Sequence, residues 1–356
     1  TLSSTFFLVL CAPGAEKALV TDATERGLRL AFSRKGVVTL KAPVPLGIDD
    51  ELEAPLARFA APCFGRAASL TDDLLALARI AGGPVRLHVV GAAVDATFEQ
   101  ADELRASLVP ALGKSVLEGE RPSVGDAVVT VVLVEGTPWL TLHRHRLGRA
   151  PWPGGRPRMV LASPEEGGPP SRAWLKIHEV IERFALDPKG PERALEIGAA
   201  PGGAAFLLLE RGLEVVGVDP NDVDARVAGH RRFVHVRTPS TRLEADRIGG
   251  PFQWLLVDVN VPPGTALRGA LPFVAAHRDT LLGVIFTLKL KRWQLAAEIP
   301  DWLRRLERAA PRLRFTATSL WSHGQELVAV GVLRGVLDAD AVVSPRALAP
   351  RGQPRS

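Results

Sequence analysis

The sequence predicts an α/β protein in which a doubly wound sheet occupies the second half of the chain and a smaller α+β domain precedes it. Three observations support this prediction. Residues 196–220, EIGAAPGGAAFLLLERGLEVVGVDP, read as strand end, glycine loop, helix, strand and acid, the order of a nucleoside-binding βαβ unit. From Ser171 onward strand and helix patterns alternate, and residues 1 to about 110 mix strands and helices in an α+β pattern.

The first half is rich in short β-branched and aromatic runs. We expect strands over residues 6–10, 28–32, 37–41 and 85–90, and helices from about residue 15 and over 101–112. Residues 128–134 and 139–142, joined by EGTP, predict a hairpin. In the second half we expect a helix over 172–184 and strands near residues 194, 213, 232, 253, 282, 313 and 326. Residues 336–356, rich in proline, alanine and arginine, predict a mobile tail.

The glycine loop favours a nucleoside cofactor over a dinucleotide. Its spacing is not G-x-G-x-x-G, and a proline stiffens the turn where a pyrophosphate needs free amides. An acid at the carboxyl end of the next strand can accept hydrogen bonds from both ribose hydroxyls. The residues we expect at this cofactor site are Glu196, Gly198, Ala199, Pro201, Gly202, Gly203, Asp219 and Asp258.

Composition limits the class of protein. The 356 residues suit about two domains, and no apolar run approaches the roughly 18 residues that span a bilayer. We read the opening FFLVLC as a strand and not a signal peptide, so a cytoplasmic protein is expected. Cys11 and Cys63 are too few for a disulfide framework or a zinc site, and no histidine spacing suggests a metal. The oligomeric state is left open.

A basic strip lies between the two halves. Residues 143–158, HRHRLGRAPWPGGRPR, hold five arginines and no acid, which predicts a linker or an exposed contact strip. Guanidinium groups suit phosphates and a tryptophan can stack on an unpaired base, so we expect RNA contacts here. Two basic residues that follow Lys289 add to these expected RNA contacts. The predicted RNA-binding residues are Arg144, Arg146, Arg149, Trp152, Arg156, Arg158, Lys291 and Arg292.

Four charged side chains fall at strand ends or on the helix that precedes the sheet. Lys289 closes GVIFTLK, Asp258 follows WLLV, Glu326 opens ELVAVGV, and Lys176 lies at the edge of an apolar helix stripe. Groups at the carboxyl ends of strands in an open α/β sheet face the ligand crevice. We therefore expect these four to share one site.

The motifs SRAWLK, LEIGAAPGG, LLVDV, FTLKLK and GQELVAV resemble, in order, those of the FtsJ/RrmJ-like RNA 2′-O-ribose methyltransferases. The resemblance implies a Rossmann-like class I domain, S-adenosyl-L-methionine as cofactor, and a catalytic tetrad of Lys176, Asp258, Lys289 and Glu326, with Lys289 as the base. The motif LCAPGAEKAL and the domain order resemble the RlmM-type subgroup, which implies a THUMP-like front domain and a cytidine of 23S rRNA as substrate.

The chemistry explains the tetrad. A ribose 2′-hydroxyl is a poor nucleophile, so its methylation needs a base and in-line positioning, with no need of a metal. We expect two lysines in one pocket to lower the pKa of one of them, although the residues alone do not separate their roles. Glu196 stands where the family usually has aspartate. No acid follows the strand over 233–236, and Glu244 or Asp246 could replace it in holding adenine.

The boundaries we expect are a THUMP-like RNA-binding region over 1–142, a linker over 143–170, the methyltransferase domain over 171–335 and a tail over 336–356. Two other functions stay open. The missing acid suits a catalytically silent RNA-binding protein with the same fold. A methyltransferase for a small molecule is less favoured, because it has no evident use for an arginine strip or a front domain.

Overall fold

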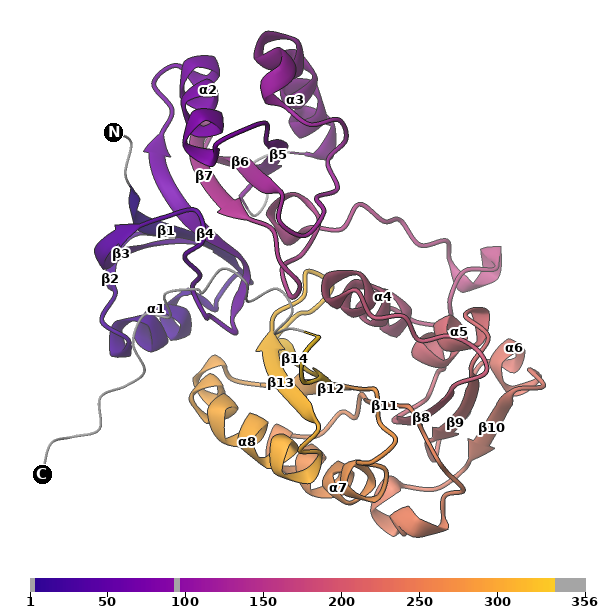
Figure 1. Ribbon diagram of the computed structural model, residues 1–356. Coiled ribbons are helices and arrows are strands. Elements are labelled where there is room, and N and C mark those ends of the chain that lie inside the picture. The colour runs from indigo at the N-terminus through magenta and orange to yellow at the C-terminus, as the bar shows by residue number, and fades with distance from the viewer. Residues whose placement is uncertain (1–3, 93–96, 337–356) are drawn as a thin grey trace, which may run out of the picture. The chain divides into compact units, whose positions relative to one another are not determined.

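Figure 1 shows the computed structural model of the chain, which describes residues 4–92 and 97–336. The chain forms two compact units, the first ending at Arg158 and the second beginning at Met159. Except for Val336, the tail predicted over residues 336–356 lies outside the described residues. None of the helices in the described part of the chain is long and apolar enough to cross a bilayer.

The first unit contains a sheet in the order β2-β3-β1-β4-β7-β6-β5. Its strands are β1 (Ser4–Cys11), β2 (Arg29–Arg34), β3 (Val37–Leu46), β4 (Ala57–Arg66), β5 (Arg86–Gly91), β6 (Ala127–Val134) and β7 (Thr137–Arg144). Its helices are α1 (Glu16–Glu25), α2 (Leu70–Ala81) and α3 (Phe98–Leu112), with 3-10 turns η1 (Gly113–Ser115) and η2 (Pro153–Gly155). Only β5 and β6 pair in parallel, so this unit is α+β, as the sequence predicts.

Two elements of the first unit were not predicted. Strand β4 contains Pro62 and Gly65, residues that normally interrupt strands, and a register shift between Cys63 and Gly65 accommodates them. Helix α2 packs its leucines with α3 onto β5, β6 and β7 in one apolar cluster. Both cysteines of the chain are buried thiols, as expected.

The second unit is built on a sheet in the order β10-β9-β8-β11-β12-β14-β13. Its strands are β8 (Arg193–Ile197), β9 (Glu214–Val218), β10 (Phe233–Val236), β11 (Trp254–Val257), β12 (Gly283–Lys289), β13 (Leu313–Thr318) and β14 (Glu326–Leu333). Its helices are α4 (Ala173–Phe184), α5 (Gly203–Glu210), α6 (Ala225–Ala228), α7 (Pro263–Ala276) and α8 (Ile299–Ala309), with 3-10 turns η3 (Pro164–Glu166), η4 (Ser240–Arg242), η5 (Ala245–Arg247) and η6 (Trp293–Glu298).

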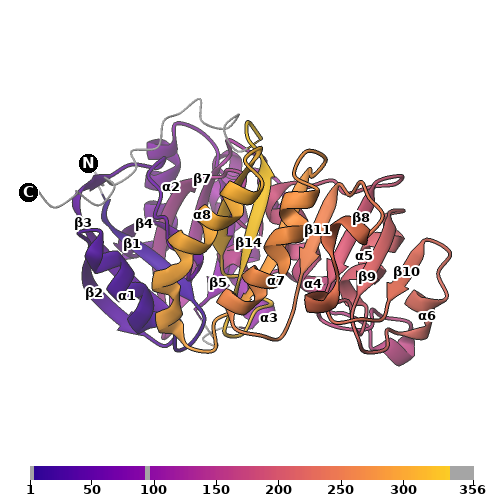
Figure 2. The same cartoon turned by 90° about the horizontal axis from the view of Figure 1, so that it is seen from below.

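Strands β10, β9, β8, β11 and β12 are parallel, and β14 runs antiparallel to both β12 and β13. Figures 1 and 2 show α4 and α5 on one face of this sheet and α7 and α8 on the other. The parallel strands are short and almost fully apolar because helices bury both faces. This is the predicted doubly wound α/β sheet. Its parallel strands end at one edge, which places the candidate site there.

Candidate active site

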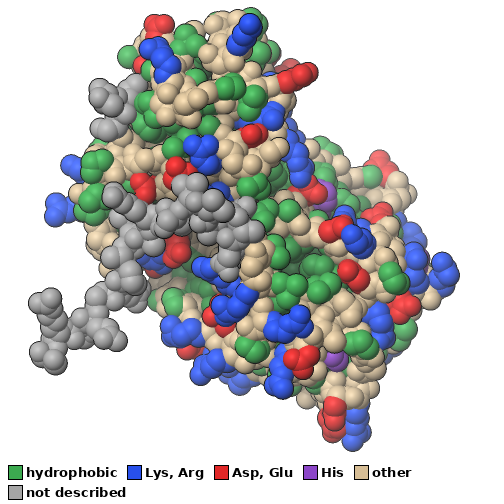
Figure 3. All heavy atoms as spheres, in the orientation of Figure 1, with side chains coloured by type: hydrophobic (Ala, Val, Ile, Leu, Met, Phe, Trp, Pro, Cys, Tyr) green, Lys and Arg blue, Asp and Glu red, His purple; other side chains and the backbone are tan. Residues whose placement is uncertain are grey.

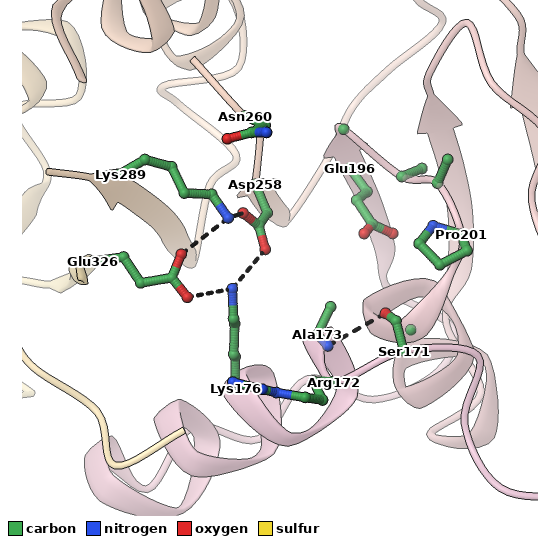
Figure 4. Close-up of a pocket in the computed structure, with 14 residues that line it drawn as sticks. Ser171, Arg172, Ala173, Lys176, Glu196, Pro201, Asp258, Asn260, Lys289 and Glu326 are labelled. Atoms are coloured by element: carbon green, nitrogen blue, oxygen red, sulfur yellow. Dashed lines mark hydrogen bonds and ion pairs between the residues drawn. The ribbon is translucent and has the colours of Figure 1, made fainter. Parts of the chain in front are cut away.

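A pocket of about 460 Å³ lies at the carboxyl ends of β8, β11 and β12, and Figure 4 shows its lining. Helix α4 closes one side of it and the loop between β8 and α5 closes another. The lining residues are Ser171, Arg172, Ala173, Lys176, Glu196, Gly198, Ala199, Ala200, Pro201, Gly203, Asp258, Asn260, Lys289 and Glu326. The pocket thus joins the predicted glycine loop to the four predicted charged residues.

Those four residues form a closed ring of ion pairs, drawn as dashed lines in Figure 4. Lys176 Nζ lies 2.7 Å from Glu326 Oε1 and 3.2 Å from Asp258 Oδ2. Lys289 Nζ lies 2.9 Å from Glu326 Oε2 and 2.8 Å from Asp258 Oδ1. Each ammonium therefore contacts both carboxylates. Lys289 is the more exposed lysine, with 22% of its side chain accessible against 11% for Lys176.

The ring shifts the pKa values of Lys289 and Glu326. Burial lowers the pKa of Lys289, but the two carboxylates outweigh it and raise the pKa above its ordinary 10.5. For Glu326, the two lysines outweigh burial and lower the pKa. The expected lowering of the pKa of one of the two lysines is therefore not seen at Lys289, because two carboxylates stand between the ammonium groups.

Glycine is required at two positions of the loop. Gly198 has φ +87°, and a Cβ atom there would lie 2.4 Å from the carbonyl oxygen of Asp258. A Cβ atom on Gly203 would lie 2.3 Å from Ser171 Oγ. The two glycines let the loop pack directly against Asp258 and Ser171, and its backbone forms a cradle at the pocket. Ala199 and Pro201 line the same cradle, whereas Gly202 serves as the N-cap of α5.

Glu196 is a buried acid in the wall of this pocket. It is 2% exposed, and its Oε2 atom has no hydrogen-bond partner among the described residues. Burial, followed by the nearby charge of Asp258, raises its pKa well above the ordinary 4.5. An unpaired buried carboxyl group suits a ligand that brings a positive charge or a hydrogen-bond donor. The orphaned atom and the glycine cradle together fit the amino-acid end of an S-adenosyl group.

Asp219 follows β9, where the sequence places a ribose contact. Its Oδ2 atom accepts a hydrogen bond from the amide of Ala200 at 3.1 Å, and its Oδ1 atom accepts one from the amide of Asn221 at 2.8 Å. The carboxylate is therefore held in place beside the glycine loop, although it does not line the pocket itself.

The two acids expected to replace the one missing after β10, Glu244 and Asp246, lie away from the pocket. Arg237 pairs with Asp222, and Glu244 lies 2.6 Å from Arg247 on the surface. Asp246 is exposed, and neither it nor Glu244 lines the pocket.

The basic strip differs from the exposed segment that the sequence predicts. Arg144 and Arg146 lie 3.0 and 3.3 Å from Asp49 Oδ1, and Arg149 lies 2.7 Å from Glu51 Oε1. Arg144 ends β7, and both histidines of the strip are buried. Acids far away in the sequence account for the difference, because they lie in the same unit and neutralise these arginines.

The rest of the strip is held in the same unit. Arg158 pairs with Asp102 and Glu120, and the guanidinium of Arg156 lies 4.0 Å from the ring centroid of Phe98. Trp152 is half-buried. The strip is thus part of the first unit up to Arg158.

Lys291 and Arg292 lie next to the pocket. Lys291 Nζ is 3.3 Å from Asn260 Oδ1, and Asn260 lines the pocket. Arg292 is exposed, and it has no hydrogen-bonded or ionic side-chain partner among the described residues.

Helix α4 holds the loop that leads into Glu326, a feature that sequence reasoning missed. Glu179 is fully buried and accepts hydrogen bonds from the amides of Trp321 and Ser322 and from the hydroxyl of Ser322, at 2.7, 3.1 and 2.8 Å. Arg172 donates to the carbonyl of Ser322. The only signal in the sequence is an acid on the apolar stripe of the helix, one turn after Lys176.

Among the described residues, no group of three or more histidine, cysteine or acidic side chains could hold a metal ion. The charged groups that line the site are lysines, carboxylates and Arg172.

Residues 169–280 match the family model of the FtsJ-like methyltransferases. These residues have an FtsJ-like methyltransferase fold. Lys176 and Asp258 lie inside the matched range, whereas Lys289 and Glu326 follow it. The FtsJ-like domain thus supplies half of the ring, and the strands that complete the sheet supply the other half.

Curated relatives carry the name ribosomal RNA large subunit methyltransferase M. The chain is 37% identical to the protein of Halorhodospira halophila over 145 residues, or 40% of each chain. It is 32% identical to that of Laribacter hongkongensis over 165 residues, or 44% of each. It is 28% identical to that of Xanthomonas oryzae pv. oryzae over 239 residues, or 64% of this chain and 65% of the relative. The matches span less than two thirds of these relatives.

Proposed function

We propose that this chain transfers a methyl group from S-adenosyl-L-methionine to a ribose 2′-hydroxyl of RNA, with a cytidine of 23S ribosomal RNA as substrate. The observation that carries the proposal is a single pocket lined both by the glycine cradle and by the ring of two lysines and two carboxylates. The name shared by the relatives supports ribosomal RNA as the substrate class. With ribosomal RNA as its substrate, the protein would act in the cytoplasm.

The cofactor would be held by the cradle. Gly198 and Gly203 line the cradle and let it pack closely against Asp258 and Ser171, and Glu196 offers an unpaired carboxyl oxygen to the amino group of the cofactor. Asp219, fixed by the amides of Ala200 and Asn221, would accept hydrogen bonds from its ribose. When bound, S-adenosyl-L-methionine supplies an electrophilic methyl group on a sulfonium ion.

The ring would take the proton of the 2′-hydroxyl. Lys289 accepts it at Nζ after its own ammonium has released a proton to solvent, for which its partly exposed side chain gives a path. Asp258 and Glu326 each contact both lysines, so they fix the direction from which Lys289 can meet the hydroxyl. Lys176 holds the two carboxylates from the side of α4.

RNA would be held beside the pocket by Lys291 and Arg292. Contacts of this kind bind phosphates and position the chain without reading its sequence. Four arginines of the strip over 143–158 would bind RNA only by exchanging their present carboxylate partners, namely Arg144, Arg146, Arg149 and Arg158.

The test is transfer of labelled methyl from S-adenosyl-L-methionine to unmodified 23S ribosomal RNA, with the product mapped by alkali-resistant linkages. We expect Lys289→Ala to reduce the rate by about 10²- to 10⁴-fold, the usual contribution of a general base. Lys189→Ala is the matched control, because Lys189 is an exposed lysine of the same unit that pairs only with surface groups. Equal rates in the two variants would contradict the proposal.

A catalytically silent RNA-binding protein is the second candidate. The missing acid after β10 and the raised pKa of Lys289 favour it. It predicts RNA binding without methyl transfer to free RNA or to ribosomal precursor particles. A small-molecule methyltransferase is a third candidate. The basic strip is no argument against it, since arginines of the strip pair with acids of the first unit. The front domain, which has no evident use in such an enzyme, still argues against it.

A further inference from the structure

A second group of exposed arginines lies away from the strip that the sequence predicts. Helix α8 and the adjoining ends of β13 and β14 expose a group of arginines that no motif singled out. We call this group the α8 surface. Its members are Arg304, Arg308, Arg312 and Arg334.

The charge of the α8 surface is poorly neutralised. Arg312 and Arg334 donate to the backbone carbonyls of Asp279 and Pro311, and not to carboxylates. Arg308 makes no ion pair or side-chain hydrogen bond within the described residues. Of the acids on α8, Asp301 lies 3.5 Å from Arg304, and Glu307 accepts a hydrogen bond from the amide of Phe315. A net positive charge therefore remains.

The geometry gathers these side chains on one outward face. Helix α8 buries Ile299, Trp302 and Leu306, so Arg304 and Arg308, one turn apart, point away from the core. The amide of Arg334 donates to the carbonyl of Arg312, which makes the strand ends neighbours. Figure 3 shows basic side chains gathered over α8, on one side of the second unit.

The α8 surface is separate from the pocket. Strand β14 begins with Glu326 at the pocket and ends with Leu333 beside Arg334, so the strand ends lie about 23 Å apart at roughly 3.3 Å per residue. Exposed arginines with few carboxylate partners suit a phosphate backbone, because guanidinium groups bind phosphate oxygens in pairs.

We propose that the α8 surface binds the phosphate backbone of the RNA substrate at a distance from the methylated nucleotide. This inference rests on the proposed function for the identity of the RNA. The surface would anchor the RNA without reading its sequence, so it would affect affinity for a long RNA and its salt dependence more than the chemical step.

The experiment measures binding of the full chain to an unmodified 23S ribosomal RNA transcript over a range of salt concentrations. Arg304→Gln combined with Arg308→Gln should weaken binding about tenfold and reduce the slope of log affinity against log salt by about one per arginine. Arg231→Gln combined with Arg242→Gln is the matched control, because both are exposed arginines near β10, at the opposite edge of the same sheet. Binding of S-adenosyl-L-homocysteine, measured by calorimetry, should stay unchanged in both variants.

Two outcomes would overturn the inference. If the α8 variant keeps the affinity and salt slope of the parent, the arginines only protect the edge strand β13 from pairing. If the control variant loses as much RNA affinity as the α8 variant, the effect comes from the net charge of the protein and not from the α8 surface. Binding is measured without methyl transfer, so a parent that binds RNA through α8 but transfers no methyl would refute the proposed function alone.

Discussion

Lys176 Nζ lies 2.7 Å from Glu326 Oε1, so helix α4 and strand β14 meet through opposite charges at the rim of the pocket. The same two elements are joined a second time, because Glu179 on α4 binds the loop that leads into β14. The ring of ion pairs is therefore supported from outside by a buried carboxylate. The ionisation of the ring, the glycine cradle beside it and the support from Glu179 can each be tested.

The rate should depend steeply on pH. A base must be neutral to accept a proton, and the carboxylates of the ring raise the pKa of Lys289 above 10.5. While the pH is below that pKa, the neutral fraction of Lys289 grows tenfold for each unit by which the pH rises. We expect log kcat/KM, which reports on the free enzyme, to rise with a slope near one from about pH 7 to 9.5. If log kcat/KM instead levels off below about pH 8.5, a Lys289 with its pKa raised by the ring is not the base.

Glu326→Gln provides the companion measurement. Glu326 is one of the two groups that raise the pKa of Lys289, so its neutral replacement should lower that pKa. The rising part of the pH profile should move toward lower pH relative to the parent. An unchanged profile would show that Glu326 does not control the ionisation of the base.

Gly198→Ala should weaken cofactor binding by at least about tenfold. The added Cβ would lie 2.4 Å from the Asp258 carbonyl oxygen at φ +87°, so the loop or the end of β11 must move. Calorimetric titration with S-adenosyl-L-homocysteine measures this without catalysis. Gly249→Ala is the control, because a Cβ there meets nothing within 4 Å. Equal affinity in both variants would show that the cradle does not hold the ligand.

Glu179→Ala should reduce both stability and turnover. The change leaves two amides and the Ser322 hydroxyl without their partner, which costs about 1–3 kcal/mol for each buried group. We expect kcat to fall while KM for the cofactor stays constant, because the loop leads to Glu326 and not to the glycine cradle. Denaturant unfolding and methyl-transfer kinetics measure the two effects.

Glu179→Gln separates position from charge. The amide keeps one acceptor oxygen, so it should recover part of the stability and of kcat. A glutamine variant no better than alanine would show that the negative charge, and not the hydrogen bonds to the loop, is what matters.

The first unit should lose stability as pH falls from about 6.5 to 4. Burial lowers the pKa of His88 from 6.5 to about 4, helped by the positive charges of His145, Arg105 and Arg158 and opposed by the carbonyl of Glu120. The unfolded chain therefore binds the proton more readily. The stability present above pH 6.5 is lost progressively on acidification, by up to about 3 kcal/mol.

Thermal unfolding at pH 7, 5 and 4 measures this loss. In His88→Gln the decrease between pH 7 and pH 4 should be smaller than in the parent. Buried His143, whose pKa is also well below its ordinary value, would account for part of what remains. Identical decreases in the two proteins would rule out a contribution from His88.

The sequence by itself determined the doubly wound sheet and the order of its strands along the chain. Apolar runs, the glycine loop and the acid after β9 are local signals, and each reports on a few consecutive residues. The candidate ring could also be named from the sequence, because carboxyl ends of parallel strands share one edge of a sheet. Strand β4 was missed since its proline and glycine imitate a turn.

Only the tertiary structure decided how the charges are paired. Asp49 and Glu51 neutralise arginines almost a hundred residues away, so the basic strip is not an exposed one. The two carboxylates between Lys176 and Lys289 raise the pKa of Lys289, where a second lysine alone would lower it. On helix α8, Arg304 pairs with Asp301, whereas Arg308 makes no ion pair with the described residues. Ionic contacts between distant segments depend on distances of a few ångströms, and no local pattern of residues specifies those distances.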